Sequence, residues 1–389
     1  MRIGIFGGSF DPVHREHVCL ARSAIESLAL DTLFVLPAHT PPHKRGKTLS
    51  GDTERLEMCR LAFSTLPQVK VSDYEISQGG TSYSYLTCRH FKETYPQAEL
   101  FFLVGTDMLR DFPTWKTPED ILANATLAVC ARDEADGWVE KEREAFVKRF
   151  QKEFALINYN GAPVSSTHIR VLAGAKRDLG KFVDEKVEKY IYENRLYEIE
   201  NADKALALEK PSRVEHSLRV AETAVKRATS LGIDEKKVIT AGLFHDCAKN
   251  LSPESELLQG FALDKKWGEV PLPVLHQFTG GYVAEKAFGI KDSDVLNAIR
   301  FHTSGCEDMD VLGALIFLAD MVEEERDYEG VEILRALYWK ETPKENSRKY
   351  LFECLEEALR QTVVYLEEQG KEVYPLTKRA YAFYKNKGE

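Results

Sequence analysis

The sequence of 389 residues lacks several features that would assign it to a specialised class of protein. No stretch approaches the roughly 20 consecutive apolar residues of a membrane-spanning helix, and the N-terminus lacks the long apolar core of a signal peptide. The seven cysteines are scattered and form no Cys-x-x-Cys pair. Neither a disulfide framework nor a thiolate zinc site is therefore expected. These absences predict a cytoplasmic protein with no membrane partner.

Basic residues are also in the minority. The chain has 52 Lys and Arg against 62 Asp and Glu, which gives a net charge of −10. A general nucleic-acid binder would show a basic excess, so no nucleic-acid partner is expected. Because a domain usually holds about 100–200 residues, the length predicts two domains.

The first half alternates between short apolar runs and amphipathic stretches. Strands are predicted at 2–6, 32–37, 69–72, 100–105, 127–131 and 154–157. Alternation of strands and helices predicts an α/β fold, a Rossmann-like parallel sheet covered by helices. In such sheets, ligands bind beyond the carboxyl ends of the strands.

A glycine-rich loop follows the first predicted strand. Gly7-Gly8-Ser9-Phe10 leads into a helix whose start carries His14 and His17. Backbone N–H groups at such a helix start bind phosphate, and imidazoles stabilise charge that develops on phosphoryl oxygens. Both the dinucleotide fingerprint and the P-loop pattern are absent, which argues against an oxidoreductase. The loop therefore predicts binding of nucleotide phosphates.

Two segments of this half resemble a known superfamily. Gly7–His17 is similar to the first signature of the nucleotidyltransferases, and Val164–Arg170 is similar to their second. More closely, residues 1–198 resemble bacterial nicotinate-nucleotide adenylyltransferase. The resemblance implies transfer of AMP from ATP to nicotinate mononucleotide, which yields deamido-NAD and pyrophosphate, with Mg²⁺ accompanying ATP. No protein nucleophile is needed, so the protein positions substrates and stabilises charge.

The same resemblance implies the site residues. The catalytic groups would be His14, His17, Lys44 and Arg170. ATP would contact Gly7, Gly8, Ser9, Phe10, Gly105, Asp107, Arg132, Ser166 and Thr167. The nicotinate nucleotide would contact Glu75, Thr81, Ser82, Tyr83 and Trp115, with the indole stacked on the pyridine ring.

The resemblance leaves two points open. Glu16 stands where the family has glycine, and a glutamate beside the triphosphate would crowd or repel it unless it points outward. The acceptor could instead be nicotinamide mononucleotide or pantetheine phosphate, because the segments that favour nicotinate are less specific than the phosphate motifs.

From residue 211 onward the pattern is helical almost throughout, with an all-α bundle as the expected fold. Histidines and acids fall on it at roughly one per helix: His216, His245, Asp246, His276, His302 and Asp320. A cluster on facing helices of a bundle requires this spacing, and imidazole with carboxylate suits Fe, Mn, Zn, Co or Ni. The run 323–325 of three glutamates is expected to be a solvated helix end.

Arg213–Val220 and the His245-Asp246 pair resemble the HD phosphohydrolase superfamily, and later segments resemble HD-domain symmetrical diadenosine-tetraphosphate hydrolases. The resemblance implies an iron-containing di-metal centre, held by the six residues above, with Asp246 bridging. Lys249 would be catalytic, and Arg213 and Arg326 would bind polyphosphate.

The sequence therefore predicts a bifunctional enzyme, with an adenylyltransferase domain at 1–199 and an HD phosphohydrolase domain at 200–389. Its partners would be ATP, nicotinate mononucleotide and diadenosine tetraphosphate. Alternatively, the HD domain acts on another nucleotide or serves as a regulatory nucleotide-binding module. The sequence leaves the oligomeric state open.

Overall fold

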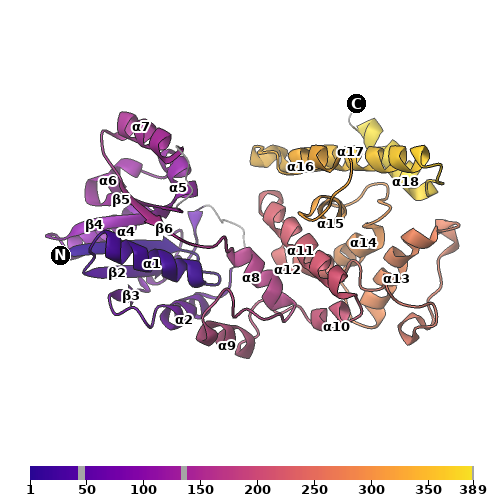
Figure 1. Ribbon diagram of the computed structural model, residues 1–389, viewed down its shortest axis with the longest axis horizontal. Coiled ribbons are helices and arrows are strands. Elements are labelled where there is room, and N and C mark those ends of the chain that lie inside the picture. Colours follow the sequence, from indigo (N-terminus) through magenta and orange to yellow (C-terminus); the bar gives the residue numbers. More distant parts are fainter. Residues whose placement is uncertain (43–48, 133–137, 388–389) are drawn as a thin grey trace. The chain divides into compact units, whose positions relative to one another are not determined.

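The computed structural model describes residues 1–42, 49–132 and 138–387. The chain forms two compact units. Met1–Ile169 and Asp178–Leu196 make the first, whereas Arg170–Arg177 and Tyr197–Glu389 make the second. Figure 1 shows strands in the first unit, and within the described ranges the second is built of helices alone.

The first unit contains a six-stranded parallel sheet, which confirms the predicted fold class. Its strands are β1 (Arg2–Gly8), β2 (Thr32–Pro37), β3 (Val69–Val71), β4 (Glu99–Gly105), β5 (Thr126–Arg132) and β6 (Ala155–Tyr159). The order is β3-β2-β1-β4-β5-β6. The chain adds β2 and β3 on one side of β1 and then β4, β5 and β6 on the other, so the strand order switches between β1 and β4. The carboxyl ends of β1 and β4 flank this switch, where open α/β sheets bind ligands.

The helices of the first unit connect and cover these strands (Figure 1). They are α1 (Arg15–Ser27), α2 (Asp52–Ala62), α3 (Tyr74–Gln78), α4 (Ser84–Thr94), α5 (Thr106–Asp111), α6 (Pro118–Asn124), α7 (Trp138–Phe150) and α9 (Glu185–Glu193). A further helix, α8 (Ser166–Gly174), begins in the first unit and belongs to the second from Arg170 onward. A 3₁₀ turn at Phe112–Thr114 follows α5. Buried Ile3 and Ile5 of β1 share one core with Phe91 of α4 and Phe146 of α7. This apolar packing fixes the strand ends that carry the phosphate loop.

The second unit is helical, as the sequence predicts. Its helices are α10 (Ala202–Leu206), α11 (Pro211–Leu231), α12 (Glu235–Phe244), α13 (Leu272–Lys286), α14 (Ser293–Phe301), α15 (Val311–Val322), α16 (Val331–Tyr338), α17 (Ser347–Glu368) and α18 (Pro375–Lys387), with 3₁₀ turns at Glu256–Leu258, Lys265–Trp267 and Lys344–Asn346. Asp234, Asp292 and Asp310 cap the N-termini of α12, α14 and α15 through their side chains. Each cap satisfies backbone N–H groups that the helix leaves unpaired.

A glycine lets α11 and α12 approach closely. A Cβ on Gly242 would lie 2.6 Å from the Cα of Ala221, so a larger residue would push the helices apart. This contact brings His216 of α11 near the end of α12, where His245 and Asp246 follow. Among the described helices, none is both long and apolar enough to span a membrane.

Candidate functional sites in the two halves

The two histidines after the glycine loop stack at the start of α1. Their ring centroids lie 3.7 Å apart, and His14 is 7% exposed. The backbone N–H of His14 donates to Nδ1 of His17 at 3.1 Å. Because that nitrogen accepts, the proton of the neutral His17 ring is on Nε2. Both rings therefore sit at the positive end of the α1 dipole, where phosphate binds favourably.

A second helix start lies beside the same loop. The hydroxyl of Ser166, the first residue of α8, donates to the carbonyl oxygen of Pro12 at 3.0 Å. Thr167 follows it in the first turn. The structure thus brings the predicted groups from both ends of the first unit, His14, His17, Ser166 and Thr167, to the end of β1.

Three predicted catalytic or ATP-binding residues have a different outcome. Arg170 is 6% exposed and forms an ion pair with Glu235, a residue of the same second unit. Its guanidinium is engaged by a carboxylate, so a pyrophosphate contact stays a prediction. Lys44 and the side chain of Arg132 lie outside the described residues.

The segment predicted to contact nicotinate packs beside the glycine loop. Oε1 of Glu75 accepts a hydrogen bond from the Thr87 hydroxyl at 2.7 Å. A Cβ on Gly7 would lie 3.9 Å from the same oxygen. Burial raises the pKa of Glu75, whereas hydrogen bonds from Thr87 and Ser82 lower it less strongly. Glu75 is therefore buried beside Gly7 and is held in place by hydrogen bonds from its neighbours.

Two aromatic residues of the predicted acceptor pocket, Trp115 and Tyr83, each contact a neighbouring side chain. Trp115 packs edge-on against Phe102, with ring centroids 6.3 Å apart. Tyr83 has the ammonium of Lys116 over its ring, 4.3 Å from the centroid. Thr81 forms an isolated bridge with Thr40, which follows β2. The backbone N–H of Ser82 donates to the carbonyl of Thr40 at 3.0 Å, so this segment is tied to the carboxyl end of β2.

At two positions near this site, a glycine leaves room for a neighbouring carboxylate. A Cβ on Gly105, at the end of β4, would lie 2.6 Å from Oδ1 of Asp107. The Glu16 carboxylate lies against Gly161, where a Cβ would overlap it. The sequence departure at Glu16 is thus accommodated by the absence of a side chain at Gly161.

Sequence reasoning missed Arg55, which anchors the glycine loop. This guanidinium is 1% exposed. It donates to the carbonyl oxygen of Ser9 at 2.9 Å and to that of Ser50 at 3.0 Å, and it pairs with Asp52. Asp52 and Arg55 lie three residues apart at the start of α2, and this spacing was the available signal.

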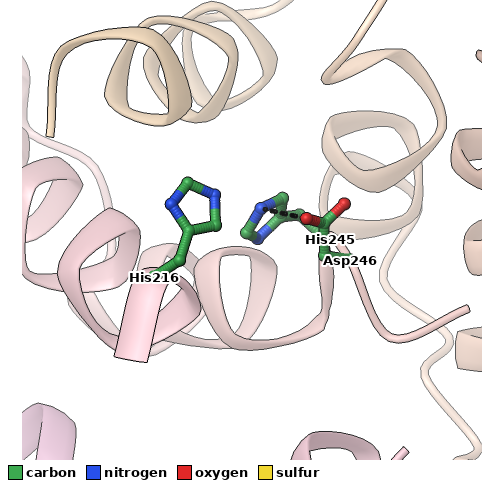
Figure 2. Close-up of side chains that lie close together, drawn as sticks. All are labelled: His216, His245 and Asp246. Carbon is green, nitrogen blue, oxygen red and sulfur yellow. Dashed lines mark ion pairs between the residues drawn. The ribbon is translucent and has the colours of Figure 1, made fainter. Parts of the chain in front are cut away.

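In the second unit, the six predicted metal ligands come together from five segments. Figure 2 shows three of them, with His216 opposite the close contact between His245 and Asp246. The ligand atoms form three overlapping groups, each within 4.8 Å: His216, His245 and Asp246; His245, His302 and Asp320; and Asp246, His276 and His302. All are buried except Asp320, whose side chain is 13% exposed.

Asp246 lies at the centre of this cluster. Its Oδ1 is 3.2 Å from Nε2 of His276 and 3.3 Å from Nε2 of His302. Burial would raise the pKa of Asp246, but the neighbouring imidazoles hold it well below the usual range. The carboxylate is therefore ionised and placed between histidines from two different helices, as a bridging ligand would be.

The donor set fits a divalent metal. Burial lowers the pKa of His245 to about 3, so this imidazole is neutral. Its Nε2 is buried, lies 3.5 Å from Oδ2 of Asp246 and makes no hydrogen bond within the described part of the chain. A neutral, buried ring nitrogen beside ionised carboxylates fits coordination of a divalent cation. The cluster together with the HD family indicates a divalent-metal site.

Basic residues surround the cluster. Arg213 Nη1 and Lys249 Nζ each lie 3.1 Å from Oδ2 of Asp246. Arg326 donates to the backbone carbonyl of Asp320 at 2.6 Å and pairs with its carboxylate. Each of these three side chains is between 28% and 32% exposed, so their charges remain within reach of a ligand.

One prediction about the surface was wrong. Glu324 and Glu325 are exposed, but Glu323 is buried at 2% and contacts His216. Burial would raise its pKa, but hydrogen bonds from His216 and Arg219 lower it to about 2. Glu323 lies three residues after Asp320, near the same helix face, and this spacing was the missed signal.

Glu209 was also missed. It is 8% exposed, and Oε2 accepts a hydrogen bond from the Ser217 hydroxyl at 2.9 Å. Its Oε1 is buried without a hydrogen-bond partner among the residues described. Burial raises the pKa of Glu209 to about 8, so the carboxyl carries a proton at neutral pH. No motif in the sequence marked this position.

Comparisons with known proteins assign both halves. Residues 5–172 match the cytidylyltransferase-like family, and residues 213–325 match the HD domain family. A protein of Mycoplasma genitalium, named as a probable nicotinate-nucleotide adenylyltransferase/Ap4A hydrolase, is 31% identical over 85% of this chain and 91% of its own.

Two further relatives each cover one half. A probable nicotinate-nucleotide adenylyltransferase of Clostridium botulinum is 36% identical over 51% of this chain and 99% of its own. A crystal structure of a predicted HD superfamily hydrolase involved in NAD metabolism, from Clostridium acetobutylicum, is 30% identical. It covers 48% of this chain and 95% of its own, with a TM-score of 0.41. The two-half match to the Mycoplasma protein carries the assignment: this chain belongs to the nicotinate-nucleotide adenylyltransferase/Ap4A hydrolase family.

Proposed function

We propose that the first half transfers the adenylyl group of ATP to nicotinate mononucleotide. The stacked pair of His14 and His17 at the glycine loop carries this proposal. The phosphate oxygen of the mononucleotide attacks the α-phosphorus of ATP, and the bond to the β-phosphate oxygen breaks, so that pyrophosphate leaves. Nε2–H of His17 donates to phosphoryl oxygens, and the start of α8 stabilises the same charge.

Lys116 supports an acid as the acceptor. Its ammonium lies over Tyr83, in the segment predicted to contact the pyridine ring. A cation there would attract the carboxylate of nicotinate and gain nothing from a neutral amide. Pyrophosphate release should therefore be measured with nicotinate mononucleotide, nicotinamide mononucleotide and pantetheine phosphate. Equal rates with the acid and the amide would contradict this choice of acceptor. Lys116→Gln should reduce the difference between the rates with nicotinate mononucleotide and with nicotinamide mononucleotide.

We further propose that the second half hydrolyses diadenosine tetraphosphate symmetrically into two ADP. The convergence of six histidines and aspartates, of which Asp320 alone is partly exposed, carries this proposal. They would hold two divalent ions, which we propose to be iron. Such ions lower the pKa of bound water and polarise phosphoryl oxygens. Arg213, Lys249 and Arg326 would bind and orient the polyphosphate. In an acidic protein, these side chains supply the local positive charge.

The test uses the full chain with Fe²⁺ or Mn²⁺ and diadenosine tetraphosphate. ADP should be released by the wild type and not by His245→Ala. If the wild type releases no more ADP than this variant, the hydrolase proposal fails. Binding of the nucleotide without turnover would favour the alternative, a regulatory nucleotide-binding module.

We assign the transferase function to residues 1–199 and the hydrolase function to residues 200–389. All seven cysteines are free thiols, which supports a reducing cytoplasm as the location.

A further inference from the structure

Three histidines of the metal cluster are held by their Nδ1 atoms, but not by the same kind of group. Nδ1 of His245 lies 2.7 Å from the carbonyl oxygen of Gly242, and Nδ1 of His302 lies 2.8 Å from that of Ile299. Because a carbonyl oxygen only accepts, both Nδ1 atoms carry the proton, and Nε2 is the ligand atom. Nδ1 of His216 instead meets a carboxylate, Oε1 of Glu323, at 3.0 Å.

The Glu323 carboxylate is fixed in one orientation. Its second oxygen, Oε2, accepts from Nε of Arg219 at 2.7 Å and from the backbone N–H of Glu325 at 2.9 Å. The side chain is 2% exposed. Glu323 belongs to none of the ligand groups found among the described residues. It therefore contacts a ligand without being one, and any effect on a metal must pass through His216.

We propose that Glu323 is a positioning residue that keeps His216 in its Nδ1–H form and strengthens its bond to a divalent ion. The ion concerned is the one that His216, His245 and Asp246 would hold, so the inference rests on the proposed metal-dependent function. A carboxylate that accepts the Nδ1 proton makes Nε2 a better electron donor and fixes the ring plane. At His245 and His302 the acceptor is a neutral backbone carbonyl, which orients the ring but carries less negative charge than a carboxylate. Glu323 thus tunes one part of the cluster selectively.

The test compares Mn²⁺ binding by the full chain and three variants after removal of metal with EDTA. Glu323→Ala removes the acceptor, Glu323→Gln keeps an amide oxygen without the charge, and Glu324→Gln removes the same charge from the exposed neighbouring residue. We expect Glu323→Ala to weaken the binding of one ion by about 10–100-fold. Glu323→Gln should show a smaller loss, and Glu324→Gln should bind like the wild type. The ion held by Asp246, His276 and His302 should be retained in all of them.

Two results would overturn the inference. The first is wild-type Mn²⁺ affinity and stoichiometry in both Glu323 variants. The second is loss of both ions together with a lower unfolding midpoint in EDTA for Glu323→Gln, which would indicate a general structural role. A wild type that binds Mn²⁺ but releases no ADP would contradict the hydrolase proposal alone, because the comparison of Mn²⁺ affinities would still decide the role of Glu323.

Discussion

Nε2 of His276 lies 3.2 Å from Oδ1 of Asp246, although a connection with two 3₁₀ turns separates Asp246 from the start of α13. This contact joins α13 to the centre of the metal cluster. Asp246 thus contacts three of the predicted ligands, His245, His276 and His302. The first prediction concerns this carboxylate.

Asp246→Asn should lower metal content and reduce ADP release from diadenosine tetraphosphate by at least about 100-fold. An amide cannot supply the negative charge that two divalent ions require at a shared ligand. Metal content by elemental analysis and ADP release by chromatography check both effects. Asp327→Asn, at an exposed position near the same site, is the matched control. Full metal content in Asp246→Asn would contradict its assignment as a bridging ligand.

The second prediction concerns His14. His14→Ala should lower the rate of adenylyl transfer by about 10²–10³-fold, because one preorganised donor to the phosphates is lost. Metal content of the second unit should not change. His90→Ala is the control, since His90 also stacks on an aromatic ring, that of Tyr74 at 3.8 Å. Similar losses of transferase activity in both variants would indicate a folding defect and not a role at the phosphates.

Arg55→Met should destabilise the first unit by about 1–3 kcal/mol, because it leaves the carbonyl oxygens of Ser9 and Ser50 without their buried donor. Adenylyl transfer should also fall, because the carbonyl of Ser9 loses its donor and the glycine loop its anchor. Denaturant unfolding and pyrophosphate release measure the two effects. Arg60→Met, an exposed position on the same helix, should change neither quantity. Wild-type stability in Arg55→Met would refute the anchoring role.

The fourth prediction concerns pH. The folded-state pKa of Glu209 is about 8, above its unfolded value of about 4.3. The folded chain thus holds a proton that the unfolded chain releases, and stability falls as pH rises from about 4.3 to 8, by up to about 1.4 kcal/mol per pH unit. Glu209→Gln, which mimics the protonated form, should raise the unfolding midpoint in EDTA at pH 8 and change it little at pH 5.

The control for this prediction is Glu215→Gln, because Glu215 is exposed on the helix that follows. It should leave the midpoint unchanged at both pH values. An equal effect of Glu209→Gln at pH 5 and pH 8 would show that the carboxyl does not titrate in this range.

The sequence by itself determined the fold class, because apolar periodicity follows directly from which faces of a strand or helix must leave water. It also predicted a phosphate-binding role for the glycine loop and the six histidines and aspartates that the structure brings together. These residues stand in local patterns, such as His14 and His17 at one helix start. Their residue types restrict them to few roles.

Only the tertiary structure decided which groups support those residues. Arg55 reaches the carbonyl of Ser9, and Glu323 reaches the ring of His216, across distances in sequence that carry no periodic signal. The same is true of Arg170, whose partner Glu235 occupies its guanidinium. A buried charge must find a partner wherever folding places one. Such pairs depend on the packing of whole helices, so local sequence patterns predict the ligands better than the residues that hold them.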